Sequence, residues 1–247
     1  MSEFVSCPGF PQKRVRTVLC GDCDRKIITL LNQYFERVIV FEKNPFLDSR
    51  VSFHTDLNVF HKGENEIILS PYQKKLYEAL SDMGMKAVFS KSEVRSPYPY
   101  DCRLNCAVFP GWLFLNKAAD ESVLSFAEEK ELKLLPVRQG YCKCSILLVN
   151  EKAFITDDEG IFNSATENGF RCLLVEKGDV RLHGFDYGFI GGCGSLIDKN
   201  LLLFFGDITK HRNYLEIKDF LLKEGCSFVF EEGLELSDIG GIVPLIY

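Results

Sequence analysis

Hydrophobic and polar positions follow one repeated order along this chain. A short apolar run ends in a polar or glycine turn and leads into a stretch in which apolar residues recur every three or four positions. The run is typical of a buried strand, and the stretch that follows it is typical of an amphipathic helix. Five such runs are present: RTVLCGD (16–22), EIILSP (66–71), WLFLN (112–116), AFITDD (153–158) and LLFFGD (202–207).

Each of these strands precedes a predicted helix, and each helix precedes another apolar strand. In the first helix Ile27, Leu30 and Leu31 share one face, as the apolar residues of a surface helix do. Asp120 and Asp158 stand where an N-cap is expected, because their carboxylates can accept bonds from the free N–H groups of the first helical turn. The strands after the helices begin at Val38, Lys86, Lys133, Cys172 and Ser227.

The strand–helix–strand pattern is periodic. Intervals of 40 to 50 residues separate the turn residues that end the five first strands, which are Gly21, Ser70, Asn116, Thr156 and Gly206. A period of this size predicts a propeller or an array of repeated units. The alternative is a generic α/β protein in which strands and helices merely alternate.

One more predicted strand precedes each unit. Four of these strands begin at His54, Tyr100, Gly140 and Asp186. The fifth is the segment LSDIGGIVPLIY (236–247), whose IGG repeats the IGG at 190–192. The first unit is therefore split between the two ends of the chain, and joining them closes a ring.

The predicted fold is α/β, with residues 1–247 in a single domain. It is a five-bladed α/β propeller of five ββαβ units with pseudo-fivefold symmetry, closed by the C-terminal strand joining the N-terminal unit. The predicted units are 236–247 plus 14–50, 51–95, 96–138, 139–182 and 183–235.

Composition supports a globular protein and narrows its partners. The 247 residues are 46% hydrophobic and 26% charged, which favours a folded core over a disordered chain. No apolar run reaches the roughly 18 residues of a membrane span, and the opening residues lack the order of a signal peptide, so we expect a cytoplasmic protein. The net charge is −6 without a basic block, which argues against a nucleic-acid partner.

Ten cysteines are present, and in a reducing compartment they are expected to be thiols, metal ligands or buried apolar groups. Two close pairs, Cys20–Cys23 and Cys142–Cys144, leave zinc binding and burial as free thiols both open. On a predicted strand, Cys142 and Cys144 would point to the same face. We assign no metal and no cofactor from the sequence.

A closed ring of five ββαβ units resembles the pentein fold of the guanidino-group-modifying enzymes, which include arginine and agmatine deiminases, amidinotransferases and dimethylarginine hydrolases. The phrases FIGGCG, FFGD, GYCKC and SDIGGIVPL are most similar to an uncharacterised bacterial branch with this fold, a family of unknown function. The resemblance implies an enzyme that acts on C–N bonds, either a hydrolase or an amidinotransferase-like enzyme.

In those enzymes a cysteine thiolate attacks the guanidinium carbon, a histidine handles protons, and acidic residues hold the cation. The resemblance places the nucleophile shortly after a late Gly-Gly pair. Here Gly240 and Gly241 are followed by Ile242, Val243 and Pro244, and no cysteine occurs after Cys226. The usual nucleophile is therefore absent from its expected position.

The first strands of such a ring converge near its axis, so their polar residues predict a central acidic pocket. His54, Asp56 and Asn58 alternate along one predicted strand and would face the same side. The catalytic candidates are His54, Asp56 and Cys193, the last as a substitute nucleophile after Gly191-Gly192. His61, on the same predicted strand, is interpreted as a residue of a solvated edge.

Eight further residues are candidates for ligand binding. Arg103 suits a carboxylate or a phosphate, although an internal salt bridge explains it equally well, and a buried Lys143 suits binding or Schiff-base chemistry. The glycines at 191 and 192 allow close backbone approach to a ligand. The full set is Asn58, Arg103, Asn105, Lys143, Cys144, Gly191, Gly192 and Asp238.

Two functions remain open at this point. The first is an enzyme that binds or modifies a small guanidinium or amine ligand in the acidic pocket. The second is a non-catalytic interaction or binding protein, a degenerate enzyme on the same scaffold. The missing late cysteine favours the second, and the polar residues gathered on the first strands favour the first.

Overall fold

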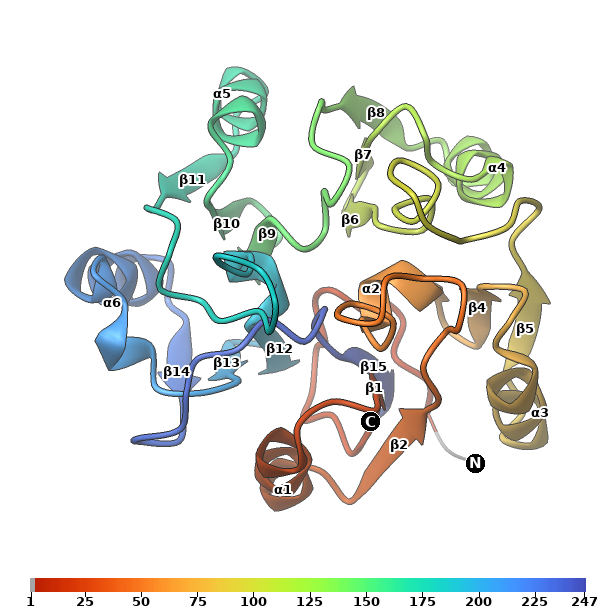
Figure 1. Cartoon of the computed structure of the whole chain (residues 1–247). Coiled ribbons are helices and arrows are strands. Elements are labelled where there is room, and N and C mark those ends of the chain that lie inside the picture. The colour runs from red at the N-terminus through yellow and green to blue at the C-terminus, as the bar shows by residue number, and fades with distance from the viewer. Residues whose placement is uncertain (1–2) are drawn as a thin grey trace.

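The computed structural model describes residues 3–247, which form five three-stranded sheets arranged around a common centre with helices at the periphery (Figure 1). In every sheet the middle strand pairs antiparallel with one neighbour and parallel with the other. The strands, sheet by sheet, are β15 (Val243–Ile246), β1 (Thr17–Gly21) and β2 (Arg37–Phe41); β3 (Val59–Gly63), β4 (Glu66–Leu69) and β5 (Lys86–Phe89); β6 (Ala107–Phe109), β7 (Trp112–Leu115) and β8 (Lys133–Pro136); β9 (Ile146–Asn150), β10 (Ala153–Thr156) and β11 (Arg171–Leu174); and β12 (Gly194–Asp198), β13 (Leu201–Phe204) and β14 (Ser227–Val229).

One longer helix connects the two parallel strands of each sheet, as the repeat predicts. Asp120 and Asp158 cap two of these helices through bonds from Ser122 N and Ile161 N, which confirms both predicted N-caps. The helices are α1 (Arg25–Tyr34), α3 (Lys74–Asp82), α4 (Glu121–Glu129), α5 (Glu159–Glu167) and α6 (Tyr214–Lys223), with a short α2 (Thr55–Asn58) and the 3₁₀ turns η1 (Ile190–Gly192) and η2 (Ile208–Lys210).

The last strand of the described chain pairs with the first. β15 lies antiparallel to β1, with Thr17 opposite Ile246 and Val18 opposite Pro244. Every residue of β1 is buried, because β15 and β2 flank it and α1 covers it with Ile27, Leu30 and Leu31. The two ends of the chain therefore complete one sheet.

The segments predicted as first strands differ from the prediction in one consistent way. Each begins with a turn or short helix, and regular pairing starts only at Val59, Ala107, Ile146, Gly194 and Val243. The expectation that His54, Asp56 and Asn58 alternate on a strand is therefore wrong, because residues 55–58 form α2. The Asn58 amide donates to Ser52 O and His54 O, which stabilises this tight turn.

His61 also departs from its interpretation as a residue of a solvated edge. It lies on β3, an outer strand of its sheet, but β3 faces the centre of the molecule and the side chain is buried. Its Nε2 lies 3.1 Å from Glu64 O, and burial lowers the pKa of the imidazole to about 4. None of the helices among residues 3–247 is long and apolar enough to span a membrane.

Candidate functional site

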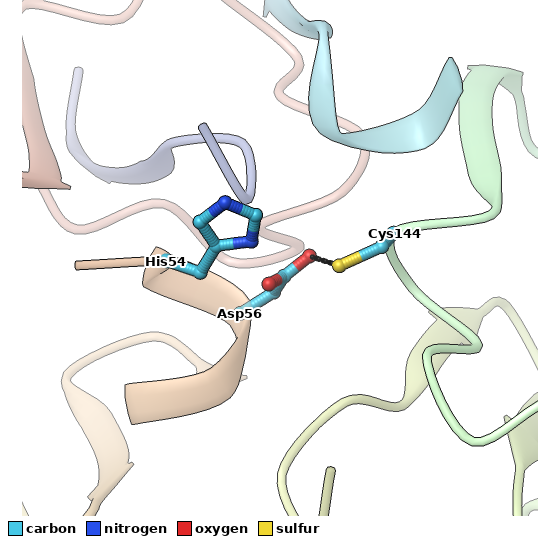
Figure 2. Close-up of side chains that lie close together, drawn as sticks. All are labelled: His54, Asp56 and Cys144. Carbon is cyan, nitrogen blue, oxygen red and sulfur yellow. Dashed lines mark hydrogen bonds between the residues drawn. The ribbon is translucent and has the colours of Figure 1, made fainter. Parts of the chain in front are cut away.

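The turns that precede β3, β9 and β15 bring four polar side chains together at the centre of the molecule. His54 and Asp56 come from the turn around α2, Cys144 from the turn before β9, and Asp238 from the segment before β15. We call these four residues the central cluster. Figure 2 shows the first three pointing toward one another. Each of the four is at least nine-tenths buried.

The closest contact in the central cluster joins a thiol to a carboxylate. The Cys144 thiol donates to Asp56 Oδ2 at 2.9 Å (Figure 2). Burial raises the pKa of Asp56 to about 6, opposed by the nearby charges of His54 and Lys143. Burial, together with the charges of Asp56 and Asp238, raises the pKa of Cys144 well above its usual value, so the thiol is protonated in the ligand-free protein.

Two polar atoms of the central cluster have no hydrogen-bond partner. They are Nε2 of His54 and Oδ1 of Asp56, and both are buried. On the other side of the imidazole, Nδ1 of His54 lies 3.9 Å from Asp238 Oδ1. Buried polar atoms normally find a partner, so unpaired atoms at a central site indicate a place for a ligand.

Asp238 and Asn105 fix the geometry around these groups. Asp238 accepts bonds from Phe189 N and Gly240 N, both at 2.9 Å. Asn105 donates to the Cys144 sulfur at 3.2 Å and accepts bonds from the backbone N–H groups of Lys143 and Cys144. Asn105 is therefore a positioning residue that holds the thiol against Asp56.

Two cavities lie beside the central cluster. The first, which we call the loop cavity, has a volume of about 230 Å³ and is lined by His54, Cys144, Asp186 and Asp238. Aromatic side chains complete much of its wall, namely Tyr141, Phe185, Tyr187 and Phe189. No lysine or arginine is among the described residues that line it.

The second, which we call the strand cavity, is lined mainly by apolar side chains and has a volume of about 90 Å³. Its polar lining comes from Asp56, His61, Lys143 and Ser195. Asp56 therefore faces the strand cavity while its hydrogen-bond partner Cys144 faces the loop cavity. The central cluster separates the two cavities.

The sequence prediction of a central polar site is matched by geometry for five of its residues. His54, Asp56, Cys144 and Asp238 form the central cluster, and Asn105 contacts it directly. Lys143 lines the strand cavity next to Asp56. Their roles in catalysis or binding stay predictions.

The other predicted residues lie away from both cavities or serve packing. Asn58 bonds within its own turn, and the Arg103 guanidinium lies 5.3 Å from the ring centroid of Tyr100. Cys193 is fully buried, and its thiol donates to Ile190 O at 3.1 Å. The backbone of η1 packs tightly at Gly191 and Gly192, where a Cβ would overlap Cys144 O and the Asp238 carboxylate.

One acidic group near the site, Asp157, was not predicted from the sequence. Asp157 is buried, accepts a bond from Ile190 N at 3.0 Å, and leaves Oδ1 without a partner. Burial raises its pKa to about 7. The sequence offered a signal in the pair Asp157-Asp158 after β10, since only one of two adjacent carboxylates is needed to cap α5.

The two cysteine pairs do not form paired metal sites. Cys142 and Cys144 lie in a turn rather than on a strand, and Cys142 packs in an apolar cluster while Cys144 enters the central cluster. Within residues 3–247, the group of donor side chains close enough to hold a metal ion is His54, Asp56 and Cys144. Cys20 and Cys23 are outside it.

The fold of this chain is similar to that of solved amidinotransferases and of an agmatine deiminase. The inosamine-phosphate amidinotransferase of Streptomyces griseus aligns over 98% of this chain and 96% of its own, with 11% identity and a TM-score of 0.58. The agmatine deiminase of C. jejuni aligns over 94% of this chain and 90% of its own, with 10% identity and a TM-score of 0.57.

An amidinotransferase from Microseira wollei, of the saxitoxin biosynthetic pathway, aligns over 93% of this chain and 92% of its own, with 10% identity and a TM-score of 0.57. At these identities the likeness shows the fold alone. No curated protein matches the sequence significantly.

The chain itself belongs to a family of unknown function, DUF6873, whose family model matches residues 18–243. That span includes all four residues of the central cluster.

Proposed function

We propose that this protein binds a small cation, a guanidinium or amine compound, in the loop cavity, and that Cys144 is the nucleophile that modifies it. The observation that carries the proposal is the composition of the central cluster. Two buried carboxylates surround a thiol and an imidazole, and the loop cavity beside them has acidic and aromatic walls. A cation supplies the charge that this site lacks.

The chemistry follows from the contact between Cys144 and Asp56. Asp56 accepts the thiol proton as the sulfur attacks the guanidinium carbon and forms a C–S bond. A C–N bond of that carbon then breaks, and the leaving nitrogen takes the proton that Asp56 accepted. Water attacks the same carbon and gives a proton to His54, the C–S bond breaks, and that proton returns to the sulfur, so that the sum is hydrolysis of one C–N bond.

A bound cation also promotes the first step. The Cys144 thiol is protonated in the free protein because burial, and then the charges of two nearby carboxylates, raise its pKa. A guanidinium group placed beside these carboxylates offsets their charge and favours the thiolate. The pocket is therefore matched to a charged substrate rather than a neutral one.

The loop cavity favours ligands without a carboxylate. An amino acid such as arginine brings a carboxylate that needs a cationic partner, and the cavity wall offers Asp186 and Asp238 instead. The rings of Tyr187 and Phe189 already have the Lys177 ammonium 5.7 Å and 6.0 Å from their centroids, so the preference rests on the two carboxylates. We therefore expect agmatine, a decarboxylated arginine, to bind more tightly than arginine.

The non-catalytic alternative rests on one observation as well. The segment that follows Gly240-Gly241, where a nucleophile is expected from the resemblance, carries Ile242, Val243 and Pro244. A protein that keeps the acidic pocket without an active thiolate binds the cation and leaves it unchanged.

The test is calorimetric titration of the full chain with agmatine and with arginine, followed by an assay for released ammonia and amine. Wild type is expected to bind agmatine with the lower Kd and to release product. Asp238→Asn is expected to weaken binding about tenfold or more. Cys144→Ala is expected to bind but release nothing, whereas Cys142→Ala, a buried cysteine in the same turn, is the matched control.

The outcomes distinguish catalysis by Cys144 from the alternatives. Product release that survives in Cys144→Ala but is lost in Cys193→Ala returns the nucleophile to Cys193. Binding without product in wild type supports the non-catalytic alternative. If neither compound binds, the proposal is wrong, and if arginine binds as tightly as agmatine, the preference for carboxylate-free ligands is wrong.

We also infer that the five sheets are the blades of one closed propeller and that the chain is a single domain. The antiparallel pairing of β15 with β1 supports this inference, because it joins the segment before residue 247 to the first unit.

A further inference from the structure

The donor atoms of His54, Asp56 and Cys144 form a compact group. One nitrogen, one carboxylate oxygen and one sulfur all lie within 4.8 Å of one another (Figure 2). Tetrahedral zinc has bonds of about 2.0 to 2.3 Å to such atoms, so its ligands lie about 3.3 to 3.8 Å apart. Small side-chain adjustments are enough to reach these separations.

A second observation points to a ligand at the same place. Two of the three side chains have a buried atom with no hydrogen-bond partner, namely His54 Nε2 and Asp56 Oδ1. His54 is 2% exposed and Asp56 is 6% exposed, so water from bulk solvent does not explain them. An ion bound beside Asp56 gives the unpaired carboxylate oxygen a partner.

The chemical types of the donors select the class of ion. Calcium and magnesium take oxygen ligands, whereas a thiolate and an imidazole are typical ligands of zinc and similar transition metals. The surroundings also match those of zinc ligands. Asp238 Oδ1 lies 3.9 Å from Nδ1 of His54 and therefore adds a second carboxylate beside that ring nitrogen. Asn105 holds Cys144 in place through bonds to its sulfur and its backbone N–H, as groups around metal ligands do.

We propose that the imidazole of His54, the carboxylate of Asp56 and the sulfur of Cys144 form a binding site for Zn²⁺ or a similar divalent cation, with Nδ1 as the ring nitrogen that faces the other two donors (Figure 2). His54 and Cys144 line the loop cavity, so the fourth coordination position opens into it and remains for water or an added ligand. The site uses only Cys144 from the two cysteine pairs noted in the sequence, and it combines this residue with Asp56, 88 positions away.

Metal binding changes one covalent bond. The Cys144 S–H bond breaks, the sulfur keeps the electron pair and binds the metal, and the proton leaves to solvent. The Asp56 carboxylate, which accepts that proton in the free protein, becomes available to the ion. No oxidant or reductant takes part.

This proposal does not depend on the function proposed above. The metal and a guanidinium compound occupy overlapping space and are therefore expected to compete. Failure of agmatine to bind leaves the metal proposal intact, and failure of zinc to bind leaves the cation proposal intact.

The test uses the full chain freed of metal with a chelator and then titrated with Zn²⁺ in competition with a chromophoric chelator. One equivalent is expected to bind with wild type. Cys144→Ala and His54→Ala are expected to lose that equivalent, and Asp238→Asn to weaken it about 10- to 100-fold. Cys142→Ala controls for removal of a buried cysteine in the same turn, and Cys23→Ala controls for binding at the Cys20–Cys23 pair.

Cobalt provides an independent readout of the sulfur ligand. Co²⁺ bound to a thiolate gives a charge-transfer absorption in the near ultraviolet, expected with wild type and Cys142→Ala but absent with Cys144→Ala. Circular dichroism and thermal melting of every variant separate loss of the site from loss of the fold, and Zn²⁺ should raise the Tm of wild type only where the site is intact. The proposal is overturned if folded Cys144→Ala binds the same equivalent as wild type, or if wild type binds none.

Discussion

Single residues set the geometry of the central cluster, and Gly240 is constrained in two ways. Its φ is +71°, and a Cβ there would lie 2.7 Å from the Cβ of His54 and 2.8 Å from Asp56 Oδ1. The backbone of the late Gly-Gly pair thus lies directly against α2. A side chain at this position forces His54 and Asp56 away from Cys144.

Gly240→Ala is therefore expected to lower the free energy of unfolding by roughly 2–4 kcal/mol, because it combines left-handed backbone strain with a steric overlap. Gly233→Ala is the matched control, since its φ is +74° but nothing lies within 4 Å of the added methyl group. The control should lose only about 1 kcal/mol. Urea denaturation measures both values, and equal losses would contradict the steric argument.

The pKa of Asp157 is raised to about 7 by burial and by the charge of Asp238. The hydrogen bond from Ile190 N and the charge of Lys177 act in the opposite direction. The unfolded carboxyl ionises near pH 4, whereas the folded one keeps its proton until about pH 7. The folded state therefore binds the extra proton in this window, and its stability falls as the pH rises from about 4 to about 7.

Asp157→Asn removes this penalty and is expected to be more stable than wild type at pH 8, with a smaller difference at pH 5. The change is at most about 1.4 kcal/mol for each pH unit within the window. Urea denaturation at the two pH values gives the measurement. Asp158→Asn, the neighbouring helix cap, serves as the control and should show no such growth. A constant difference between wild type and Asp157→Asn at both pH values would refute the assignment.

Some residues of the site could be predicted from the sequence, but the contacts between them could not. His54, Asp56, Cys144 and Asp238 could be selected from the sequence because they lie in the segments predicted as first strands, which converge near the axis of such a ring. The pairing of Cys144 with Asp56 could not, because it depends on two turns that are 88 residues apart. Cys193 follows a Gly-Gly pair, yet its thiol turns back onto Ile190 O, and periodicity gives no information on that direction.

Among the elements, the loop over residues 183–189 controls one wall of the loop cavity. It contributes Phe185, Asp186, Tyr187 and Phe189 to the lining. Arg50 links this loop to the segment before α2, because its guanidinium donates to Gly184 O at 2.7 Å and lies 3.9 Å from the ring centroid of Phe185.

Arg50→Ala is expected to increase hydrogen exchange across residues 183–189 and to weaken agmatine binding severalfold, because an unfastened loop must be ordered when the ligand binds. Hydrogen-exchange mass spectrometry and calorimetry test the two effects. Arg171→Ala, which removes an arginine paired with Glu224 on the outer side of the molecule, is the control. Unchanged exchange in the loop would show that Arg50 does not hold it.

The helices and the buried middle strands were predictable because their apolar periodicity is regular. The first strand of each sheet was less predictable. The polar residues at 54–58, 100–106 and 140–145 form turns stabilised by their own side chains, as with the bonds from Asn58 to Ser52 O and His54 O. Alternating polar and apolar residues satisfy a strand pattern and such a turn equally well.

At the scale of the whole molecule, the recurrence of three element types and the matching IGG phrases were sufficient to place the last segment beside the first unit. Removal of residues 236–247 is therefore expected to unfold the protein rather than shorten a tail. The deletion removes β15 and also Asp238 and Leu245, both buried.

Circular dichroism and gel filtration of the chain truncated after Glu235 test this prediction. A synthetic peptide of residues 236–247, added during refolding, is the control that separates a missing strand from irreversible aggregation. A truncated chain that melts cooperatively at the wild-type temperature would contradict the prediction.

The pairing of β15 with β1 also determines the order in which the molecule is completed. Arg16 and Tyr247, joined by a hydrogen bond of 2.6 Å, are 231 residues apart in sequence. During synthesis β1 emerges early, but its antiparallel partner emerges only after the other four sheets have been made. Until then one edge of β1 has unpaired backbone N–H and C=O groups, and such an edge can pair with other chains and cause aggregation. The sheet that contains β1 is therefore the last of the five to be completed, and β1 is the strand that most needs protection from aggregation during synthesis.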